Sequence, residues 1–342
     1  MFGKIIGTGS YIPERKITNN ELTELVETND EWIRERTGIG ARHVMTEENT
    51  AEMAHRAAKR AVQNANIDVS QIDLIIVSSV SSNLILPNTA CYVQDKLGAV
   101  NAMCFDLNTA CTGFMVAYNT AQTYINAGLI NTALIIAAEG LSKLVDWTDR
   151  ETCILFGDGA GAAVITKDED AVFDTVMHAD GSEGNSLFME NDFATRTVPF
   201  VKNTDKAKAD QANEANKAVD TDETGGANYI SMNGRDVFMF AVDKVPKCIK
   251  ELLGKIEKTV DDIDWFVLHQ ANERIISSIT KRIKADSAKV PVNIAEYGNT
   301  SSACIPILLD EMMREGKLKK GDKIIMSGFG AGLTWSATYL EL

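Results

Sequence analysis

"NTACTGFMVAYNTAQTYINAG" (residues 108–128) holds the change from a strand pattern to a helix pattern that best indicates the fold class of this chain. The residues before it, "NAMCFDL" (101–107), form the short apolar run that a buried strand requires. From residue 112 the apolar side chains recur at helical spacing as far as Gly128, a residue type that commonly ends helices. The pattern predicts a strand, a tight turn at Cys111 and then a helix.

The same alternation runs through most of the chain. A helix is predicted over residues 49–66, capped by Asn49 or Thr50. Further buried strands are predicted at "DLIIVSSV" (73–80), "TALIIAAEG" (132–140) and "GAAVITKD" (161–168). Strands that alternate with helices favour an α/β fold with buried central strands.

The second half of the chain repeats the first. Two pairs of segments match in order: "SQIDLIIVSS" (70–79) with "DDIDWFVLHQ" (261–270), and "NTAC" (108–111) with "NTSS" (299–302). Asp73 falls on Asp264 and Asn108 falls on Asn299, so both matches have an offset of 191 positions. A constant offset indicates two duplicated halves. Two similar halves that pack together bring corresponding strand ends to one interface, which is a common place for a catalytic pocket.

Composition and charge narrow the class of protein. The chain has 342 residues, 45% of them hydrophobic and 24% charged, which suits one large α/β domain or two fused units. A net charge of −14 argues against a nucleic-acid-binding protein, because phosphate contacts require clustered Lys and Arg. The first residues lack the pattern of a signal peptide, and no apolar run reaches the roughly 18–20 residues that span a bilayer. We therefore expect a cytoplasmic protein without membrane contact.

The segment "KNTDKAKADQANEANKAVDTDETGG" (202–226) lies between the halves and is strongly polar. Val219 is its one branched or larger apolar residue, beside ten charged ones. Such a segment cannot bury a core of its own. It is interpreted as a solvated insertion or flexible loop, with a lid over a pocket as the alternative.

Cys111 is the first candidate for chemistry. Of six cysteines, none forms a C-x-x-C pair, so reduced thiols are expected in place of a zinc site or a disulfide framework. Unpaired N–H groups at a helix start stabilise a thiolate, so we expect the Cys111 pKa to fall and the residue to act as a nucleophile. The alternative is one more small buried thiol.

His269 and Asn299 are the second and third candidates. His269 ends the apolar run "WFVL" and precedes a predicted helix, a place where α/β folds carry catalytic groups. Asn299 begins the loop that repeats the Cys111 loop. Taken singly, His269 could be a satisfied near-core histidine and Asn299 a helix cap. Together, a thiolate that carries an acyl group and two donors to an oxyanion suit decarboxylation followed by carbon–carbon bond formation.

Two glycine-rich segments resemble nucleotide-binding loops. "FGDGAGA" (156–162) is followed by a predicted strand, "AVIT", where a dinucleotide fingerprint requires a helix. "SGFGAGLTW" (327–335) also leads into a strand-like run. We expect the second segment to allow close backbone approach, with an N–H group near a thioester carbonyl.

The motifs taken together resemble beta-ketoacyl-acyl carrier protein synthase III, a family of the thiolase-like superfamily. The matching motifs, in chain order, are "GTGSYIP", "NDEWIRERTGI", "NTACTGF", "ILFGDGAGAAV", "HQAN", "YGNTSSA" and "GFGAGLTW". The resemblance implies a five-layered α-β-α-β-α fold and a homodimer, with no cofactor and no metal. It divides the chain into a half that carries the nucleophile (1–171) and a half that carries His269 and Asn299 (172–342).

The resemblance also implies a two-step reaction. Cys111 would accept an acyl group from acyl-CoA, and malonyl-acyl carrier protein would then lose CO2 while His269 and Asn299 stabilise the enolate. The carbanion would attack the acyl-Cys111 thioester, whose oxyanion would face the backbone N–H groups of Cys111 and Ala331. Further matches are the substrate-binding residues Trp32, Arg36, Thr37, Arg150, Phe156, Gly234 and Leu86, of which Trp32 and Arg150 would stack on adenine.

Docking of a carrier protein needs a basic surface on this acidic chain. The helix after His269 supplies one, with Arg274 at the family's docking arginine; a solvated helix face is the alternative. The basic residues of this helix are Arg274, Lys281, Arg282 and Lys284.

The chain departs from the family pattern at four positions. Glu151 stands where glycine is usual, so we expect it to pair with Arg150 or to repel phosphate. Leu86 stands where many members have phenylalanine, so we expect primers longer than acetyl. Met239 stands where a basic docking residue is common. Ala331 replaces one glycine, a mild change if only its N–H group is used.

Other functions are compatible with the same residues. One is a synthase III-like condensing enzyme or an acyltransferase of secondary metabolism that does not decarboxylate. A hydroxymethylglutaryl-CoA synthase would need a general-acid glutamate, and Glu139 does not discriminate because synthases III have a similar residue there. A non-catalytic acyl-binding protein is disfavoured by the intact Cys-His-Asn set.

Overall fold

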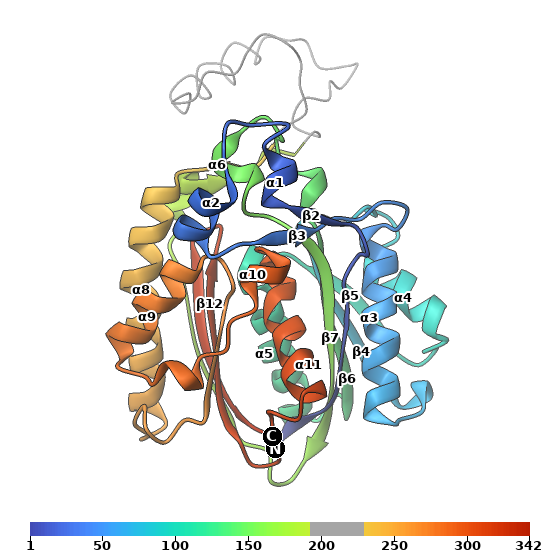
Figure 1. The fold of residues 1–342 in the computed structure, drawn as a ribbon. Helices are drawn as coiled ribbons and strands as arrows, with labels where there is room; N and C mark the ends of the chain where they lie inside the picture. Colours follow the sequence, from blue (N-terminus) through green and yellow to red (C-terminus); the bar gives the residue numbers. More distant parts are fainter. Residues whose placement is uncertain (192–228) are drawn as a thin grey trace, which may run out of the picture.

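Two β-sheets form the frame of the molecule in the computed structural model, which describes residues 1–191 and 229–342 (Figure 1). The polar segment predicted as an insertion (202–226) lies outside the described residues. Sheet one has the order β1-β7-β6-β4-β5 and sheet two the order β11-β12-β13-β8. The strands of sheet one are β1 (Phe2–Tyr11), β4 (Leu74–Ser78), β5 (Met103–Leu107), β6 (Thr132–Gly140) and β7 (Asp158–Asp168); those of sheet two are β8 (Phe173–Ala179), β11 (Trp265–Leu268), β12 (Lys323–Gly330) and β13 (Thr334–Glu341).

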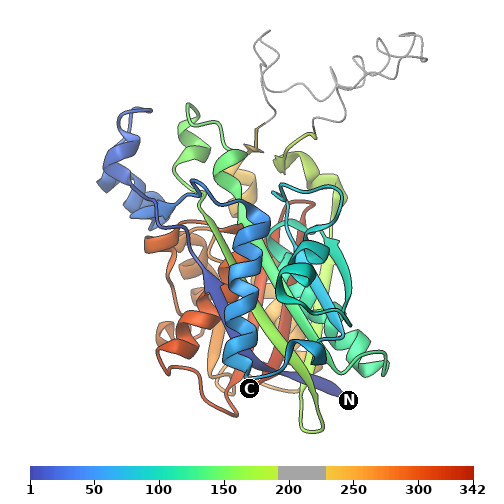
Figure 2. The same ribbon diagram turned by 90° about the vertical axis from the view of Figure 1, so that its right-hand side faces the viewer.

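Helices form three layers around these sheets. The inner layer, between the sheets, is α5 (Gly113–Asn126) and α11 (Cys304–Arg314). The outer face of sheet one is covered by α3 (Thr50–Ala65) and α4 (Thr89–Leu97), and Figure 2 shows α3 crossing the strands. The outer face of sheet two is covered by α8 (Gly234–Lys255) and α9 (Glu273–Ile283). The predicted five-layered α-β-α-β-α fold is confirmed.

Alternation within β4 explains why its sequence is apolar throughout. Leu74 and Ile76 face the inner helices, whereas Ile75 and Val77 face α3 and α4. Because successive side chains of a strand point to opposite faces, a strand between two helix layers needs apolar residues at every position.

A smaller cap closes one end of the layers and has an apolar cluster of its own, which includes Leu22, Ile33 and Leu141. Its elements are α1 (Asn19–Leu22), α2 (Asp30–Thr37), α6 (Arg150–Cys153), the paired strands β2 (Lys16–Thr18) and β3 (Ala41–His43), and the paired strands β9 (Leu187–Phe188) and β10 (Ser231–Met232). The short helix α10 (Ile294–Tyr297) precedes the Asn299 loop.

The duplication inferred from the sequence recurs in individual hydrogen bonds. The Asp73 carboxylate accepts from Thr132 N at 3.0 Å, and the Asp264 carboxylate accepts from Lys323 N at 2.8 Å. Lys323 lies 191 positions after Thr132, the offset that the sequence predicts. Sheet one takes its strands from residues 2–168 and sheet two from residues 173–341; the division at residue 171 stays a prediction.

The two turns that the sequence pairs also share an unusual backbone conformation. Ala110 and Ser301 both have φ near 49°, a left-handed value that is costly for residues with a Cβ. Each turn leads directly into an inner helix, α5 or α11. The two halves therefore use the same turn to present the residues that follow.

The structure decides one local prediction and corrects another. Asn49 is the cap of α3, since its side chain accepts from Glu52 N, which decides between Asn49 and Thr50. The glycines of "FGDGAGA" lie mostly inside β7 and do not precede a strand as predicted. A Cβ at Gly161 would lie 2.8 Å from Ile307 N, so these glycines let α11 pack against β7.

No helix within residues 1–191 and 229–342 is both long and apolar enough to cross a bilayer.

Gly9→Ala should destabilise the fold through the contact of β1 with α3. A Cβ at Gly9 would overlap the α3 backbone at Ala57 and Ala61, and such overpacking costs roughly 1–3 kcal/mol. Gly254→Ala is the matched control, because Gly254 lies in α8 with open space around it and alanine there should stabilise by about 0.5–1 kcal/mol. Urea unfolding of both variants measures the difference; equal free energies of unfolding would contradict the packing.

Candidate active site

Cys111 lies in a 3₁₀ turn (Ala110–Thr112) between β5 and α5. Its side chain is half-buried. Gly330, at the end of β12, contacts it so closely that a Cβ there would lie 2.7 Å from Cys111 N. The first half of the chain thus presents the thiol, and the second half lies directly against it.

The ionisation of Cys111 differs from the expectation. Burial raises the pKa of the Cys111 thiol to about 12, a hydrogen bond from Ser301 Oγ (3.3 Å) opposes this, and the charge of Glu139 adds to it. The predicted fall in pKa is therefore wrong, because the cost of desolvating a thiolate exceeds its stabilisation at the helix start. Cys111 is therefore a protonated thiol near pH 7, and any attack by its sulfur must include transfer of that proton.

His269 follows the last residue of β11 and is only 3% exposed. Its backbone N–H donates to Ser327 O at 2.9 Å, and its ring meets Phe329 edge-on. Burial lowers the pKa of His269 to about 3, since an imidazolium here would lose its hydration. The residue is therefore a neutral imidazole near pH 7 and can donate one hydrogen bond to a developing oxyanion.

Asn299 is fixed at both its backbone and its side chain. Its N–H donates to Leu155 O at 2.9 Å, and its carbonyl accepts from Gly157 N at 3.0 Å. Its side-chain Oδ1 accepts from Ser301 N at 2.9 Å. Because the oxygen of the amide is used in this way, the Nδ2 group is the part left to donate to a substrate.

Strand β12 brings these groups to one place. A Cβ at Gly328 would lie 2.9 Å from His269 Cβ, and Gly330 contacts Cys111 as described above. Two positions along a strand correspond to roughly 7 Å on the same face, so β12 contacts both Cys111 and His269 from one side. Asn299 joins them through Ser301, which contacts Cys111.

Ala331 follows Gly330, in the connection to β13. Among the described residues, the Ala331 N–H group has no backbone acceptor outside helices and strands. Two N–H groups near a reactive sulfur can stabilise a thioester oxyanion, which is the role expected from the sequence for Ala331 and Cys111.

Glu139 and Ser302 form a second contact between the halves. Glu139 is fully buried, and its carboxylate accepts from Ser302 Oγ and Ser81 Oγ at 2.6 Å each. Positions 139 and 302 correspond, at the offset of 191, to Gly330 and Cys111. The nucleophile–glycine contact therefore has a counterpart in which a hydroxyl meets a carboxylate.

Sequence reasoning missed Ser301 and Cys304 as neighbours of the candidate site. Ser301 contacts Cys111, and the Cys304 sulfur lies 2.9 Å from His269 Nδ1. The repeat could have identified both residues. At the offset of 191, Ser301 corresponds to Ala110 in the Cys111 turn and Cys304 corresponds to Gly113 at the start of the next helix, so both should face the same interface.

A second group of predicted substrate-binding residues lies in the cap, around Trp32 on α2. The Arg36 and Arg150 guanidinium carbons lie 4.7 and 5.0 Å from the Trp32 ring centroid. Asn29 caps this helix by accepting from Trp32 N at 2.8 Å. Among the described residues, Glu151 makes no ion pair, so the expected pairing with Arg150 is wrong; the Arg150 side chain instead donates to Glu27 O at 3.3 Å.

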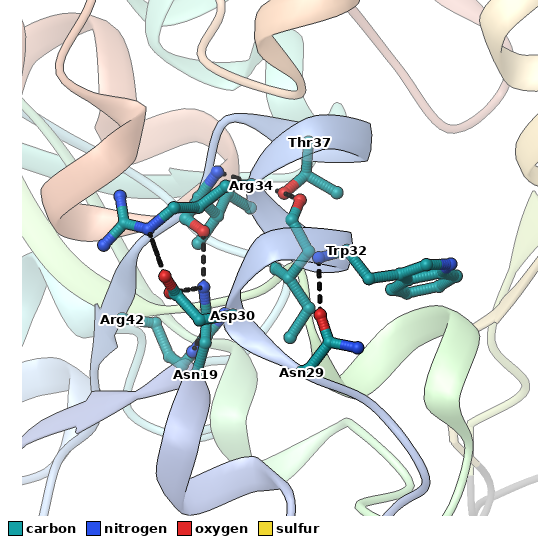
Figure 3. Close-up of polar contacts among 9 residues, drawn as sticks. Asn19, Asn29, Asp30, Trp32, Arg34, Thr37 and Arg42 are labelled. Carbon is teal, nitrogen blue, oxygen red and sulfur yellow. Dashed lines mark hydrogen bonds and ion pairs between the residues drawn. The ribbon is translucent and has the colours of Figure 1, made fainter.

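A polar network fixes the base of this helix (Figure 3). Arg42 is fully buried and donates to Asn19 Oδ1 at 2.9 Å and to Ile154 O at 2.7 Å. Asn19 donates to Asp30 at 2.9 Å, and Asp30 pairs with Arg34. Figure 3 shows the Trp32 ring pointing away from the network, which leaves it available to a ligand.

The other predicted substrate residues are more scattered. Phe156 is buried in the apolar cluster of the cap, and its backbone forms a β-bridge with Asn299. The Thr37 hydroxyl donates to Ile33 O and accepts from Ile39 N, so it is committed to its own helix end. Gly234 begins α8 and is exposed. Leu86, 88% exposed, lies in the loop before α4.

Arg274 lies in the first turn of α9, beside a surface hollow of about 420 Å³ between α9 and α2. Lys281 lines the same hollow. Asn272 Nδ2, just before α9, donates to Arg36 O at 3.1 Å, which joins this helix to the one that carries Trp32.

Comparisons with known proteins agree with this arrangement. Residues 105–181 match the family model "3-Oxoacyl-[acyl-carrier-protein (ACP)] synthase III", and residues 253–342 match the model of its C-terminal part. A beta-ketoacyl-[acyl-carrier-protein] synthase III from Clostridium acetobutylicum is 44% identical, covering 99% of this chain and 98% of the relative. The chain belongs to the synthase III family. It is therefore an acyl-transferring condensing enzyme.

Solved structures of similar proteins have the same fold over nearly their full length. The enzyme from Aquifex aeolicus VF5 is 40% identical with a TM-score of 0.86, and the match covers 99% of this chain and 100% of that one. The priming beta-ketosynthase of the R1128 polyketide pathway is 34% identical with a TM-score of 0.88, covering 100% of this chain and 96% of that one.

Replacement of His269 by Asn should change how stability depends on pH. The folded pKa of about 3 lies below the ordinary value of about 6.5, so between these pH values the unfolded chain binds a proton that the folded chain does not. Stability from this group is present above pH ~6.5 and is lost as pH falls, by up to about 1.4 kcal/mol per pH unit. Urea unfolding between pH 4 and 7 should show a shallower slope for His269→Asn; parallel curves would contradict the buried neutral histidine.

Proposed function

We propose that this chain starts fatty acid biosynthesis by condensing an acyl-CoA primer with malonyl-acyl carrier protein, with Cys111, His269 and Asn299 as the catalytic residues. The proposal rests mainly on β12, which has no side chain at Gly328 or Gly330 and there contacts His269 and Cys111. Ser301 links Asn299 to Cys111, because its N–H donates to the Asn299 side chain and its hydroxyl donates to the Cys111 sulfur. Full-length relatives named beta-ketoacyl-[acyl-carrier-protein] synthase III support the choice of substrates.

The first step acylates Cys111. The sulfur attacks the thioester carbon of acyl-CoA, the C–S bond to CoA breaks, and the proton of the thiol ends on the CoA sulfur. Because burial raises the pKa of Cys111, the thiol must lose its proton as the sulfur attacks, and the departing CoA thiolate can take it. The N–H groups of Cys111 and Ala331 hold the tetrahedral oxyanion.

The second step extends the acyl group. Malonyl-acyl carrier protein loses CO2, and the electron pair of the broken C–C bond forms an enolate. Neutral His269 and the Asn299 amide donate hydrogen bonds to the enolate oxygen, which lowers the barrier without a metal or cofactor. The enolate carbon attacks the acyl-Cys111 carbonyl, the C–S bond breaks to release 3-ketoacyl-acyl carrier protein, and the thiolate regains a proton.

Trp32, Arg36 and Arg150 are proposed to hold the nucleotide end of CoA. An indole with two guanidinium groups near its face supplies stacking and positive charge together. Phe156 is proposed as an apolar wall at the reacting end, since it adjoins Asn299. Thr37 and Gly234 are proposed to lie along the channel between the two ends, Thr37 through its backbone and side-chain carbons.

We further propose a homodimer in the cytoplasm. In the described part of the chain β5 pairs only with β4, so its other edge is free to pair with a second copy. Exposed apolar residues lie on β5, at Met103, and in the loop before α4, at Ile85 and Leu86. We propose that Leu86 enters the acyl pocket of the partner subunit. All six cysteines lie in the described ranges as free thiols, which suits a reducing compartment.

Cys111→Ser should abolish formation of the acyl-enzyme. Mass spectrometry of the intact protein after incubation with acetyl-CoA measures the added acetyl group. Cys248→Ser is the control, because Cys248 is a buried thiol in α8 whose sulfur lies 3.7 Å from Val176 O, outside the site. If the Cys111→Ser variant still gained an acetyl thioester at the wild-type rate, the acetyl group would have to be on another cysteine, and Cys111 would be rejected as the nucleophile.

Arg274→Ala should weaken use of malonyl-acyl carrier protein at least tenfold in kcat/KM and leave priming by acyl-CoA nearly unchanged. The proposed docking surface is the α9 side of the hollow that Arg274 and Lys281 line, and it would attract an acidic carrier. Arg282→Ala is the matched control, since Arg282 lies on the same helix but acts on Asp243 of α8. Equal losses in both half-reactions would contradict the docking role.

A further inference from the structure

Cys304 is the first residue of α11 and contacts the catalytic histidine directly. Its Sγ lies 2.9 Å from His269 Nδ1. Gln270, next to His269, donates its backbone N–H to the same sulfur at 3.3 Å. Both side chains of the contact are 3% exposed, so no solvent competes for this hydrogen bond.

The protons in this contact can be counted. Burial raises the pKa of the Cys304 thiol and lowers that of His269 to about 3, so near pH 7 the thiol keeps its proton and the imidazole carries one. The sulfur already accepts from Gln270 N, so its own S–H is free to donate. The acceptor that lies within reach is Nδ1.

We propose that Cys304 is a positioning residue that donates its S–H to His269 Nδ1 and thereby holds the imidazole in the tautomer protonated at Nε2. The Nε2–H group then points its proton at the enolate oxygen. The opposite tautomer would place a lone pair at Nε2, which would repel the developing charge. The proposal rests on the function proposed above, because it assigns how the oxyanion donor is kept in its donating form.

The corresponding positions in the first half have no thiol and serve as a comparison. At the offset of 191, His269 corresponds to Ser78 and Cys304 corresponds to Gly113. A Cβ at Gly113 would collide with Ser78, so the two positions are in contact in both halves. Within the described residues the Ser78 hydroxyl has no hydrogen-bond partner, whereas His269 has the sulfur. The half that supplies the oxyanion donor is the half with a polar partner at this position.

Nitrogen NMR of the wild-type protein tests the tautomer without reference to activity. The chain has four histidines, and the His269 signals are those absent from a ¹⁵N-histidine-labelled His269→Asn sample. In two-bond ¹H–¹⁵N correlation spectra near pH 7, Nε2 should have the shift of a protonated nitrogen and Nδ1 that of an unprotonated one. A protonated Nδ1 would overturn the proposal.

Two substitutions test the consequence for the reaction. Cys304→Ala should slow CO2 release from malonyl-acyl carrier protein on the order of tenfold, as expected for one lost hydrogen bond, with Cys111 acylation changed less than about twofold. Cys304→Ser should restore most of the rate, because serine and alanine differ by one hydroxyl donor. The exchanges Cys248→Ala and Cys248→Ser control for loss of a buried thiol elsewhere.

The outcomes separate the proposal from the proposed function. Equal rates for Cys304→Ala and Cys304→Ser, or equal slowing of both half-reactions, would overturn the positioning role. If the wild-type protein released no CO2 from malonyl-acyl carrier protein, the proposed function would fail, and the NMR experiment would still decide the tautomer. The NMR result on the wild-type chain also decides the proposal if the alanine variant does not fold.

Discussion

The absence of side chains at two alternate positions of β12 is the constraint on which the active site depends. Gly328 gives room to His269, and Gly330 gives room to the backbone of Cys111. Since both positions lie on one face of a strand, the imidazole of one half and the thiol of the other are held at a fixed separation. The inner helices α5 and α11 then start from this point, so packing between the sheets and geometry at the sulfur are set together.

The duplication supplies two contacts of the site twice, with different chemistry; one of them lies between the halves and the other lies within each half. In the contact between the halves, a nucleophile meets a glycine, and its counterpart is a hydroxyl that donates to a buried carboxylate. In the contact within a half, an imidazole meets a thiol, and its counterpart is a hydroxyl without a hydrogen-bond partner among the described residues. The corresponding contacts are Cys111–Gly330 with Ser302–Glu139, and His269–Cys304 with Ser78–Gly113. The two halves thus have one architecture and divided roles. The charge of buried Glu139 raises the pKa of Cys111, although Glu139 accepts a hydrogen bond from Ser302 and not from Cys111.

Apolar period and the offset of 191 were sufficient for an α/β fold with buried central strands, for the helix α3 and for grouping Cys111, His269 and Asn299 at one interface, because both are visible in the residues themselves. The five layers came from the family resemblance, and the choice between Asn49 and Thr50 as the cap needed the structure. It was not sufficient for the ionisation of Cys111, since desolvation depends on side chains that arrive from distant segments. The roles of the β7 glycines and of Ser301 were hidden for the same reason: each is a contact with a residue far along the chain.

No single half of this chain holds a complete site, because Cys111 comes from one and His269 and Asn299 come from the other. In this respect the molecule resembles a heterodimer whose two unlike subunits are joined in one polypeptide. The covalent link gives the halves a high effective concentration for each other, so the site stays assembled at any dilution of the enzyme. A fused pair can therefore carry a thiol at Cys111 and a hydroxyl at the corresponding Ser302, whereas two identical separate subunits cannot differ in this way.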